Sequence, residues 1–377
     1  MGGGLTTRWA VVVMTGGALS VSACSKSPDA AVRDSGLATP ATMDSSRPPS
    51  PNAMDAGAAP AKPEGDMQLV LDELGSLQPK PLETLTPAEA RKQPTPKDAV
   101  VALLMRQGKP TAPDASVATR DTTIPGPGGR LPVRIYTPKG ASGPLPVVVY
   151  YHGGGWVIAD RNVYDAGARA ISKDANAVVV SVDYRLAPEH KFPAAHDDAF
   201  AAYQWALANA ARIGGDPNRV ATAGESAGGN LALATAMAAR DKGVKLPVHV
   251  LSVYPIAGTD TMTASYVENA AAKPLSRPAM VWFLGHYTRS AADWKDPRIN
   301  LVGADLKGLP PVTIITDQID PLRSEGETLA RKLADAGVQV DSRNYDGVAH
   351  EFFGMGAVLE KARDANQYGA DGLKKNF

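Results

Sequence analysis

Cysteine is nearly absent from this 377-residue chain, since Cys24 is the only one. A single cysteine excludes an intramolecular disulfide, a zinc site built from cysteines and a cysteine nucleophile further along the chain. The chain also lacks an excess of charge, because 39 lysines and arginines balance 39 aspartates and glutamates. No basic stripe stands out, so nucleic acid is not expected as a partner.

The N-terminus lacks an apolar run long enough for a transmembrane helix. Residues 1–23 instead combine Arg8, a short apolar run and small residues, which is typical of a secretory signal peptide. The sequence Val21-Ser22-Ala23-Cys24 resembles the lipobox of bacterial lipoproteins, in which the cysteine becomes the first mature residue and carries acyl chains. The resemblance implies an exported protein that is lipid-anchored to a membrane at Cys24. Ser25 after the cysteine implies the outer membrane, on its periplasmic or surface face; the alternative is an ordinary signal peptide with an incidental cysteine.

A segment without apolar periodicity follows the cysteine. Residues 25–65 are rich in proline, alanine, serine and aspartate and cannot bury enough surface to offset the entropy of the chain. We therefore predict a disordered linker over residues 24–65 and a folded domain over residues 66–377.

Strands and helices alternate within the predicted domain. Predicted strands lie at residues 132–136, 147–151, 177–182, 220–224, 248–254, 312–316 and 338–345, and several of them are continuous apolar runs. Helical spacing occurs at residues 68–77, 97–107, 166–174, 194–211, 227–242 and 325–336. This alternation predicts an α/β fold, a mostly parallel sheet with helices on both faces. In such sheets the loops after the carboxyl ends of the strands hold the chemistry.

One such loop carries a serine in a specific context. The segment Gly224-Glu225-Ser226-Ala227-Gly228-Gly229 lies between a predicted strand and a predicted helix, which is the context of a G-x-S-x-G nucleophile elbow. The sharp turn leaves no room for a Cβ atom at the flanking glycines, and it exposes the Ser226 hydroxyl at a helix N-terminus that favours negative charge. We predict Ser226 as a nucleophile, against the alternative of a glycine-rich turn with an ordinary serine.

A second loop supplies main-chain donors. The segment His152-Gly153-Gly154-Gly155 directly follows the predicted strand at 147–151. Consecutive glycines allow N–H groups to turn toward a ligand, as a hydrolase needs for the oxygen that becomes negative during the reaction. A phosphate-binding loop is the alternative, but the Walker lysine and the G-x-G-x-x-G pattern are missing. We predict an oxyanion hole made by the N–H groups of Gly153, Gly154 and Ala227, with His152 orienting the loop.

The general base is predicted by elimination. Hydrolases with this elbow have the chain order serine, acid, histidine, and His249, His286 and His350 follow Ser226. His249 lies in a predicted core strand, where a packed histidine is the better interpretation. His286 comes too early to leave room for a strand that carries the acid. His350 lies in a loop after the strand at 338–345, and we predict it as the base.

Two carboxylates compete for the role of the acid. Asp317 comes directly after the predicted strand at 312–316, whereas Asp320 lies further out on the loop, from which it can reach a histidine on the neighbouring loop. The acid must hold the imidazole in one tautomer and stabilise its charged form. Position alone favours Asp320 only modestly, and the other carboxylate would then cap a helix or lie in solvent.

Taken together, these motifs resemble the bacterial hormone-sensitive-lipase-like esterases of the α/β-hydrolase superfamily. Further agreement comes from Asp183-Tyr184-Arg185-Leu186-Ala187-Pro188-Glu189 and Gly214-Gly215-Asp216-Pro217. The resemblance covers residues from about 80 to 365. It implies an eight-stranded α/β-hydrolase sheet with a helical cap, built from residues 66–120 and about 255–300.

The resemblance also implies a function. It points to hydrolysis of short- to medium-chain acyl esters through an acyl-enzyme, without metal or cofactor, and it favours Asp320 over Asp317. Three residues depart from the family's pattern: Glu225 where aspartate is commoner, Ser324 where an acidic residue is usual, and Glu351 where glycine is usual. None removes a catalytic group, so they concern substrate preference. A non-catalytic surface-binding protein on the same fold is the alternative, but such proteins usually lose a member of the triad.

Overall fold

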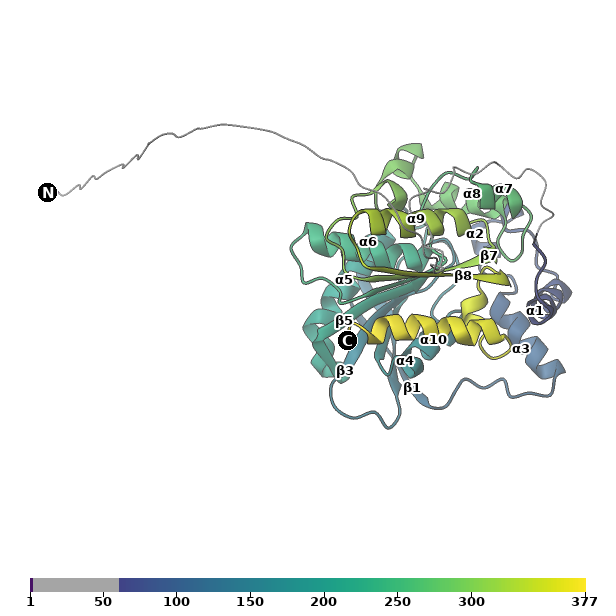
Figure 1. Cartoon of the computed structure of the whole chain (residues 1–377), viewed down its shortest axis with the longest axis horizontal. Coiled ribbons are helices and arrows are strands. Elements are labelled where there is room, and N and C mark those ends of the chain that lie inside the picture. Colours follow the sequence, from purple (N-terminus) through teal and green to yellow (C-terminus); the bar gives the residue numbers. More distant parts are fainter. Residues whose placement is uncertain (3–60) are drawn as a thin grey trace, which may run out of the picture. The chain divides into compact units, whose positions relative to one another are not determined.

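The computed structural model describes residues 1–2 and 61–377 (Figure 1). Almost all of the predicted signal peptide, the lipidation site Cys24 and the predicted linker up to residue 60 lie outside the described residues, and these assignments stay predictions. Residues 61–377 contain an eight-stranded sheet in the order β1-β2-β4-β3-β5-β6-β7-β8. This is the number of strands that the resemblance implies.

The sheet is mostly parallel. β1 pairs with β2 and β2 pairs with β4 in antiparallel register, whereas all other neighbours are parallel. The strands are β1 (Val117–Gly126), β2 (Gly129–Pro138), β3 (Leu145–Tyr151), β4 (Val178–Val182), β5 (Gly215–Glu225), β6 (Val250–Val253), β7 (Val312–Ile319) and β8 (Val340–Ala349). The parallel strands therefore end at one common edge, where the loops that follow them meet.

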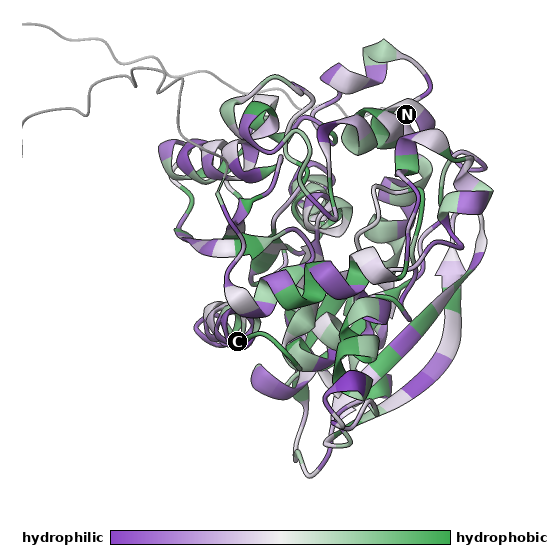
Figure 2. Ribbon diagram, turned by 90° about the vertical axis from the view of Figure 1, so that its right-hand side faces the viewer, coloured by the Kyte–Doolittle hydropathy of each residue, from purple (hydrophilic) through white to green (hydrophobic). Residues whose placement is uncertain are grey.

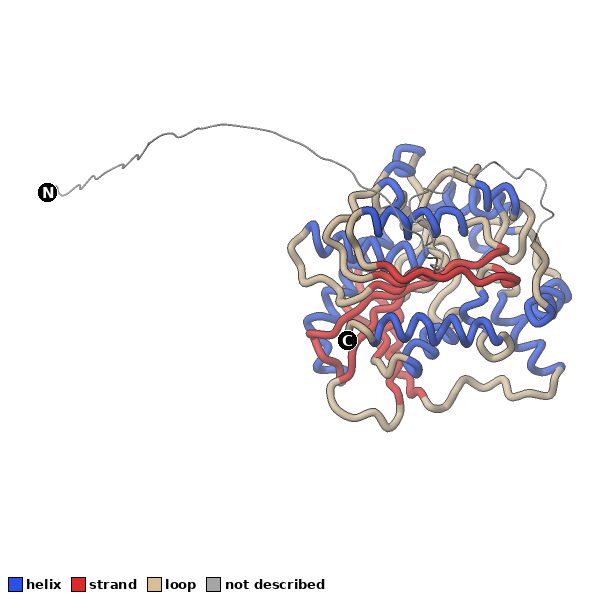
Figure 3. The backbone as a smooth tube through the Cα atoms, viewed as in Figure 1, coloured by secondary structure: helices blue, strands red, loops and turns tan. Residues whose placement is uncertain are grey.

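Helices cover both faces of the sheet (Figure 3). α4 (Asp165–Asp174) and α10 (Glu360–Lys374) lie on one face, and α5 (Ala194–Asn209), α6 (Ala227–Asp241) and α9 (Arg323–Asp335) lie on the other. In β3, Val147 and Val149 belong to one buried hydrophobic cluster, and Val148 and Tyr150 belong to the other. Successive strand residues point to opposite faces, so this continuous apolar run is buried on both sides. Figure 2 shows the hydrophobic residues gathered toward the interior.

Two further groups of helices lie at the end of the sheet toward which β7 and β8 point (Figure 1). The first comprises α1 (Gly65–Ser76), η1 (Leu82–Thr84), α2 (Pro87–Ala90) and α3 (Pro96–Arg106), and the second comprises α7 (Ala264–Glu268) and α8 (Arg277–Tyr287). The two groups are in contact, because the indole nitrogen of Trp282 donates to the Leu85 carbonyl at 3.0 Å. None of the helices in residues 61–377 is long and apolar enough to cross a membrane.

The sequence-based boundary of the N-terminal cap segment is wrong at its end. Residues 117–120, which we expected in the cap, begin the edge strand β1. Most residues of β1 are exposed, so the strand lacks the apolar alternation that reveals a half-buried strand in a sequence. Its pairing with β2 over ten residues defines it instead.

Candidate active site

Ser226 lies in the turn between β5 and α6. Its backbone has φ 58° and ψ −118°, a conformation that is strained for a residue with a side chain. The surrounding structure holds it there, since the Ser226 amide donates to the Val253 carbonyl at 2.8 Å and the Ser226 carbonyl accepts from the Asn230 amide at 3.1 Å. The backbone at the end of β3 approaches the elbow so closely that glycine is required: a Cβ atom on Gly228 would lie 1.9 Å from the Tyr151 carbonyl oxygen.

Replacement of Gly228 by alanine is therefore expected to destabilise the protein by about 3 kcal/mol, because the backbone of Tyr151 cannot give way. Gly285 is a matched control, since it also lies in a helix but a Cβ atom there would meet nothing within 4 Å. Alanine at Gly285 is expected to stabilise helix α8 by up to about 1 kcal/mol. Thermal unfolding followed by circular dichroism measures both, and equal shifts in melting temperature would contradict the role of Gly228 in the elbow.

The structure brings Ser226, His350 and Asp320 together. The distance from His350 Nε2 to Ser226 Oγ is 3.0 Å, and that from His350 Nδ1 to Asp320 Oδ2 is 2.7 Å. A carboxylate can only accept, so Nδ1 carries the proton and Nε2 is free to accept from the serine hydroxyl. Asp320 follows β7 and His350 follows β8, so the pairing of these two strands sets the distance between them. All three side chains are at most 4% exposed.

The charges around His350 favour its protonated form. Burial disfavours the imidazolium, but the Asp320 carboxylate, assisted by Glu351 and Glu225, outweighs this effect and raises the pKa of His350 above its ordinary value. Such an imidazole takes up a proton readily. This is the property that a general base needs when it accepts the proton of a serine hydroxyl.

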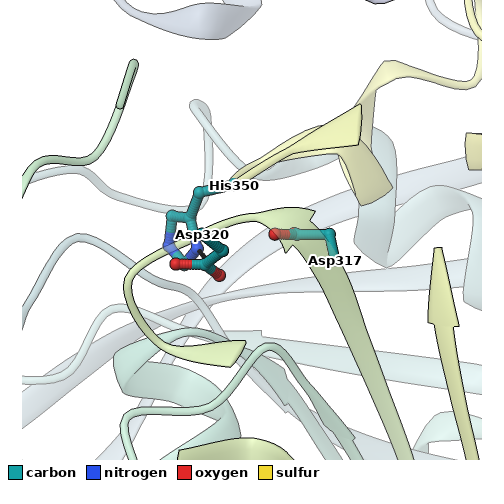
Figure 4. A group of neighbouring side chains, drawn as sticks. All are labelled: Asp317, Asp320 and His350. Carbon is teal, nitrogen blue, oxygen red and sulfur yellow. Dashed lines mark hydrogen bonds and ion pairs between the residues drawn. The ribbon is translucent and has the colours of Figure 1, made fainter. Parts of the chain in front are cut away.

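Of the two carboxylates that competed for the role of the acid, Asp320 is the one that bonds to His350. Asp320 Oδ1 also accepts from the Leu322 amide at 2.8 Å, so both of its oxygens are occupied. Asp317 is fully buried beside this pair, and Figure 4 shows its side chain directed toward it. Among residues 61–377, Asp317, Asp320 and His350 are the one group of histidine and acidic side chains close enough to hold a metal ion, with ligand atoms within 4.8 Å of one another.

The glycine loop after β3 carries the candidate oxyanion donors. Gly154 and Gly155 have φ of 92° and 58°, in the left-handed region that glycine adopts readily. A Cβ atom on Gly153 would lie 2.2 Å from the Tyr164 hydroxyl oxygen. Within residues 61–377, the N–H groups of Gly153, Gly154 and Ala227 donate to no other protein group. All three donors therefore stay available for a ligand.

His152 supports this loop and does not reach the triad. Its Nδ1 lies 2.8 Å from the Gly153 carbonyl oxygen, and its ring stacks on Tyr184 at 4.3 Å between centroids. The Tyr184 hydroxyl in turn donates to the His152 carbonyl at 2.8 Å. Burial lowers the pKa of His152 to about 4, so the imidazole is neutral at physiological pH. These contacts agree with the predicted orienting role.

A cluster of two glutamates and three tyrosines adjoins the triad, and the sequence did not reveal it. Glu225 is buried and accepts hydrogen bonds from the hydroxyls of Tyr150 and Tyr254. Glu351 accepts from the Tyr164 hydroxyl. Burial raises the pKa of Glu225 to about 7, against the hydrogen bonds from the tyrosines, which lower it. The tyrosines lie on three separate segments, so no spacing in the sequence signals the cluster.

A cavity of about 780 Å³ opens beside this cluster. It lies between α3, α4 and the start of α10, and it is lined by Val100, Leu104, Tyr164 and Met355 together with Glu225 and Glu351. The two glutamates that depart from the family's pattern therefore face this cavity. This volume is in the range of pockets for small ligands.

Comparison with known proteins identifies the family. Residues 148–354 match the model of a family described by its alpha/beta hydrolase fold. The chain is 44% identical over 250 residues to the carboxylesterase NlhH of Mycobacterium tuberculosis, which covers 65% of this chain and 78% of the relative. It is 34% identical over 291 residues to an ethyl acetate hydrolase of Pseudomonas putida, covering 75% of this chain and 88% of the relative.

Solved structures agree with the sequence relatives. The esterase of Pyrobaculum calidifontis superposes with a TM-score of 0.73 at 37% identity, covering 80% of this chain and 97% of that structure. The family match spans the elbow, the glycine loop and the predicted acid and base, all within residues 148–354. The chain therefore belongs to the α/β-hydrolase-fold family, among its hormone-sensitive-lipase-like carboxylesterases, and is a carboxylic ester hydrolase.

Proposed function

We propose that the protein hydrolyses short- to medium-chain acyl esters through an acyl-enzyme on Ser226, with His350 as general base and acid and Asp320 as its orienting partner. The observation that carries the proposal is the imidazole of His350, which lies within hydrogen-bond distance of both Ser226 Oγ and Asp320 Oδ2. A hydrolase relative named for ethyl acetate supports the small size of the acyl group.

In the first half-reaction, His350 Nε2 takes the proton of the Ser226 hydroxyl while Oγ attacks the ester carbonyl. The carbonyl oxygen becomes negative, and the N–H groups of Gly153, Gly154 and Ala227 stabilise it. The imidazolium then gives its proton to the departing alcohol oxygen, which leaves the acyl-serine. In the second half, His350 takes a proton from water, the hydroxide attacks the acyl carbon, and the acid leaves as Ser226 recovers its proton.

A series of p-nitrophenyl esters tests this substrate class. We expect kcat/KM to be highest for the acetate or butyrate and to fall for acyl chains of ten or more carbons, as the proposed preference for short- to medium-chain esters requires. A preference for the long acyl chains, measured under the same conditions, would contradict the proposed substrate class. It would not affect the assignment of Ser226 as the nucleophile.

The pH dependence of kcat/KM tests His350 as the base. Only the neutral imidazole can accept the serine proton, so activity falls as pH drops through the His350 pKa. Because the carboxylates around His350 outweigh its burial and raise this pKa above the ordinary histidine value of 6.5, the acidic limb of the profile is expected to have its midpoint above pH 6.5. A midpoint below that value would show that burial outweighs the carboxylates.

We also propose that the mature protein is exported and lipid-anchored at Cys24. This proposal is independent of the active site. The support is the sequence Val21-Ser22-Ala23-Cys24 followed by Ser25. Replacement of Cys24 by serine removes the thiol that would carry the acyl chains. We expect the full-length variant to move from the membrane fraction to the soluble fraction while its esterase activity stays the same. Equal membrane association of the variant and the natural chain would contradict the anchor.

A further inference from the structure

Asp317 is a buried carboxyl group that the proposed mechanism does not use. It lies in β7, three residues before Asp320, and has no exposed surface. Within residues 61–377, neither of its carboxylate oxygens has a hydrogen-bond partner. An ionised carboxylate in such a place would lose its hydration without any compensation, which proteins avoid by pairing the group or by neutralising it.

The neighbours of Asp317 do not pair it. Asp320 and Glu351 are themselves acidic and repel a second negative charge, and His350 Nδ1 already donates to Asp320. The positive charge of Arg323 lowers the pKa of Asp317 slightly, but its guanidinium is bonded to Glu268 at 2.5 Å and to the Gln318 carbonyl at 3.0 Å. The remaining way to avoid an unpaired buried charge is to protonate the Asp317 carboxylate.

A proton on Asp317 has an acceptor within reach. One carboxylate oxygen each of Asp317 and Asp320 and one ring nitrogen of His350 lie within 4.8 Å of one another, and Figure 4 shows the Asp317 carboxyl directed toward the other two residues. A protonated carboxyl has one O–H donor, and a carboxylate has lone pairs for more than the two bonds that Asp320 accepts from His350 and Leu322. The hydrogen bond requires a side-chain rotation that brings the two carboxyl groups together, because neither Asp317 oxygen has a partner among the described residues.

We propose that Asp317 is a positioning residue that keeps a proton and donates it in a hydrogen bond to the Asp320 carboxylate. The inference rests on the proposed function, because it gives Asp317 a role through the acid of the triad. The bond spreads the negative charge of Asp320 and limits its pull on the proton of His350. It also restrains the carboxylate that sets the orientation of the imidazole.

The electrostatics of the site support this assignment. Burial, and next to it the charge of Asp320, raise the pKa of Asp317 well above its ordinary value. With a raised pKa, the stabilisation from the bound proton is complete below the pKa of the unfolded chain and is lost as pH rises through the folded value. Loss of this proton therefore makes the protein less stable at alkaline pH, and a neutral amide at position 317 removes that effect.

A divalent cation is the alternative occupant of this group. Two carboxylates and one imidazole are suitable ligands for several metals. Here, however, His350 Nδ1 and Asp320 bond to each other at 2.7 Å, and a cation between them would replace that bond. A proton satisfies Asp317 and leaves the His350–Asp320 pair intact, so the structure favours the proton.

The test compares Asp317→Asn with Asp317→Ala, because the amide keeps a donor toward Asp320 and the methyl group does not. We expect the alanine variant to lose about tenfold in kcat/KM and its acidic limb to move to higher pH, since Asp320 then attracts the His350 proton more strongly. The asparagine variant should recover most of this loss and restore the limb. Asp341→Asn, at a half-buried position on β8 where the carboxylate pairs with Lys375, is the control for an aspartate-to-asparagine change in the sheet.

Two readouts do not depend on activity. Because Glu225 and Glu325 are also buried carboxyl groups with a raised pKa, the infrared spectrum of Asp317→Asn is subtracted from that of the wild type at neutral pH, and the difference should contain the carbonyl stretch of one protonated carboxylic acid. The asparagine variant should also melt at a higher temperature than the wild type at alkaline pH, with the difference shrinking as pH falls.

Three outcomes would overturn the proposal: equal loss of activity in both variants, an unshifted acidic limb in Asp317→Ala, or the absence of the infrared band. Inhibition by added zinc that Asp317→Asn abolishes would assign the group to a cation instead. A failure of the proposed function is distinguished from all of these, because the wild type would then be no more active than Ser226→Ala.

Discussion

Replacement of Ser226 by alanine is expected to lower kcat for p-nitrophenyl butyrate by about 10⁴- to 10⁶-fold, because the acyl-enzyme cannot form without the hydroxyl. The remaining rate would come from the oxyanion donors and from substrate binding. The loss should appear in kcat and not in KM, since the serine oxygen adds little to the binding of the ground state. Burst kinetics with the wild type and steady-state rates with the variant measure both effects.

Ser181 provides a matched control for this change. Its side chain is fully buried in β4, and among the described residues its hydroxyl has no hydrogen-bond partner. Ser181→Ala removes one buried hydroxyl, as Ser226→Ala does, but leaves the triad untouched. Its activity and melting temperature should stay close to those of the wild type. If the Ser226 variant kept more than a small fraction of the wild-type kcat, another nucleophile would have to be sought.

Asparagine in place of Asp320 is expected to reduce kcat by about 10³- to 10⁴-fold at neutral pH. The amide has nearly the shape of the carboxylate but no charge, so it cannot stabilise the imidazolium. Its NH₂ group can also donate to Nδ1, which would leave the proton on Nε2 and prevent that atom from accepting from Ser226 Oγ. The pH–rate profile of the variant should show its acidic limb at lower pH, because the strongest influence that raises the His350 pKa is gone.

Asp317→Asn is the comparison for this second result, since Asp317 lies in β7, Asp320 directly follows that strand, and both side chains are buried. The loss in Asp317→Asn should be far smaller than in Asp320→Asn. A larger loss at Asp317 would reverse the assignment of the acid. Such a result would mean that the loop after β7 rearranges when substrate binds.

The main features of the fold are predictable from the sequence because most strands are continuous apolar runs. β3, β4, β6 and β7 are largely buried on both faces, as is the second half of β5, and each appears in the sequence as a hydrophobic segment, whereas β8 is polar and exposed at its centre. α10 was not predicted, since its buried side is made mainly of small residues such as Ala362, Ala365 and Gly369. Small residues allow a helix to pack closely on a sheet, but they give little hydrophobic periodicity.

The candidate site was predictable where its residues follow strands in fixed motifs. The elbow and the glycine loop are local turns whose conformation is encoded by adjacent glycines, so the sequence is sufficient for both. The choice between Asp317 and Asp320 is different, because both lie at the carboxyl end of β7, Asp317 within the strand and Asp320 directly after it, and only the three-dimensional reach of His350 separates them. The contacts of Tyr150, Tyr164 and Tyr254 with the two glutamates depend on tertiary packing alone.

The most direct test of the account is the covalent trapping of the nucleophile. A p-nitrophenyl alkylphosphonate mimics the tetrahedral intermediate and transfers its phosphonyl group to an activated serine, with release of p-nitrophenol. We predict one phosphonyl group per chain, located by mass spectrometry on the peptide that contains Ser226, with complete loss of esterase activity. No adduct forms with Ser226→Ala. An adduct on another residue, or full labelling of Ser226 with activity retained, would contradict the assignment of Ser226 as the nucleophile.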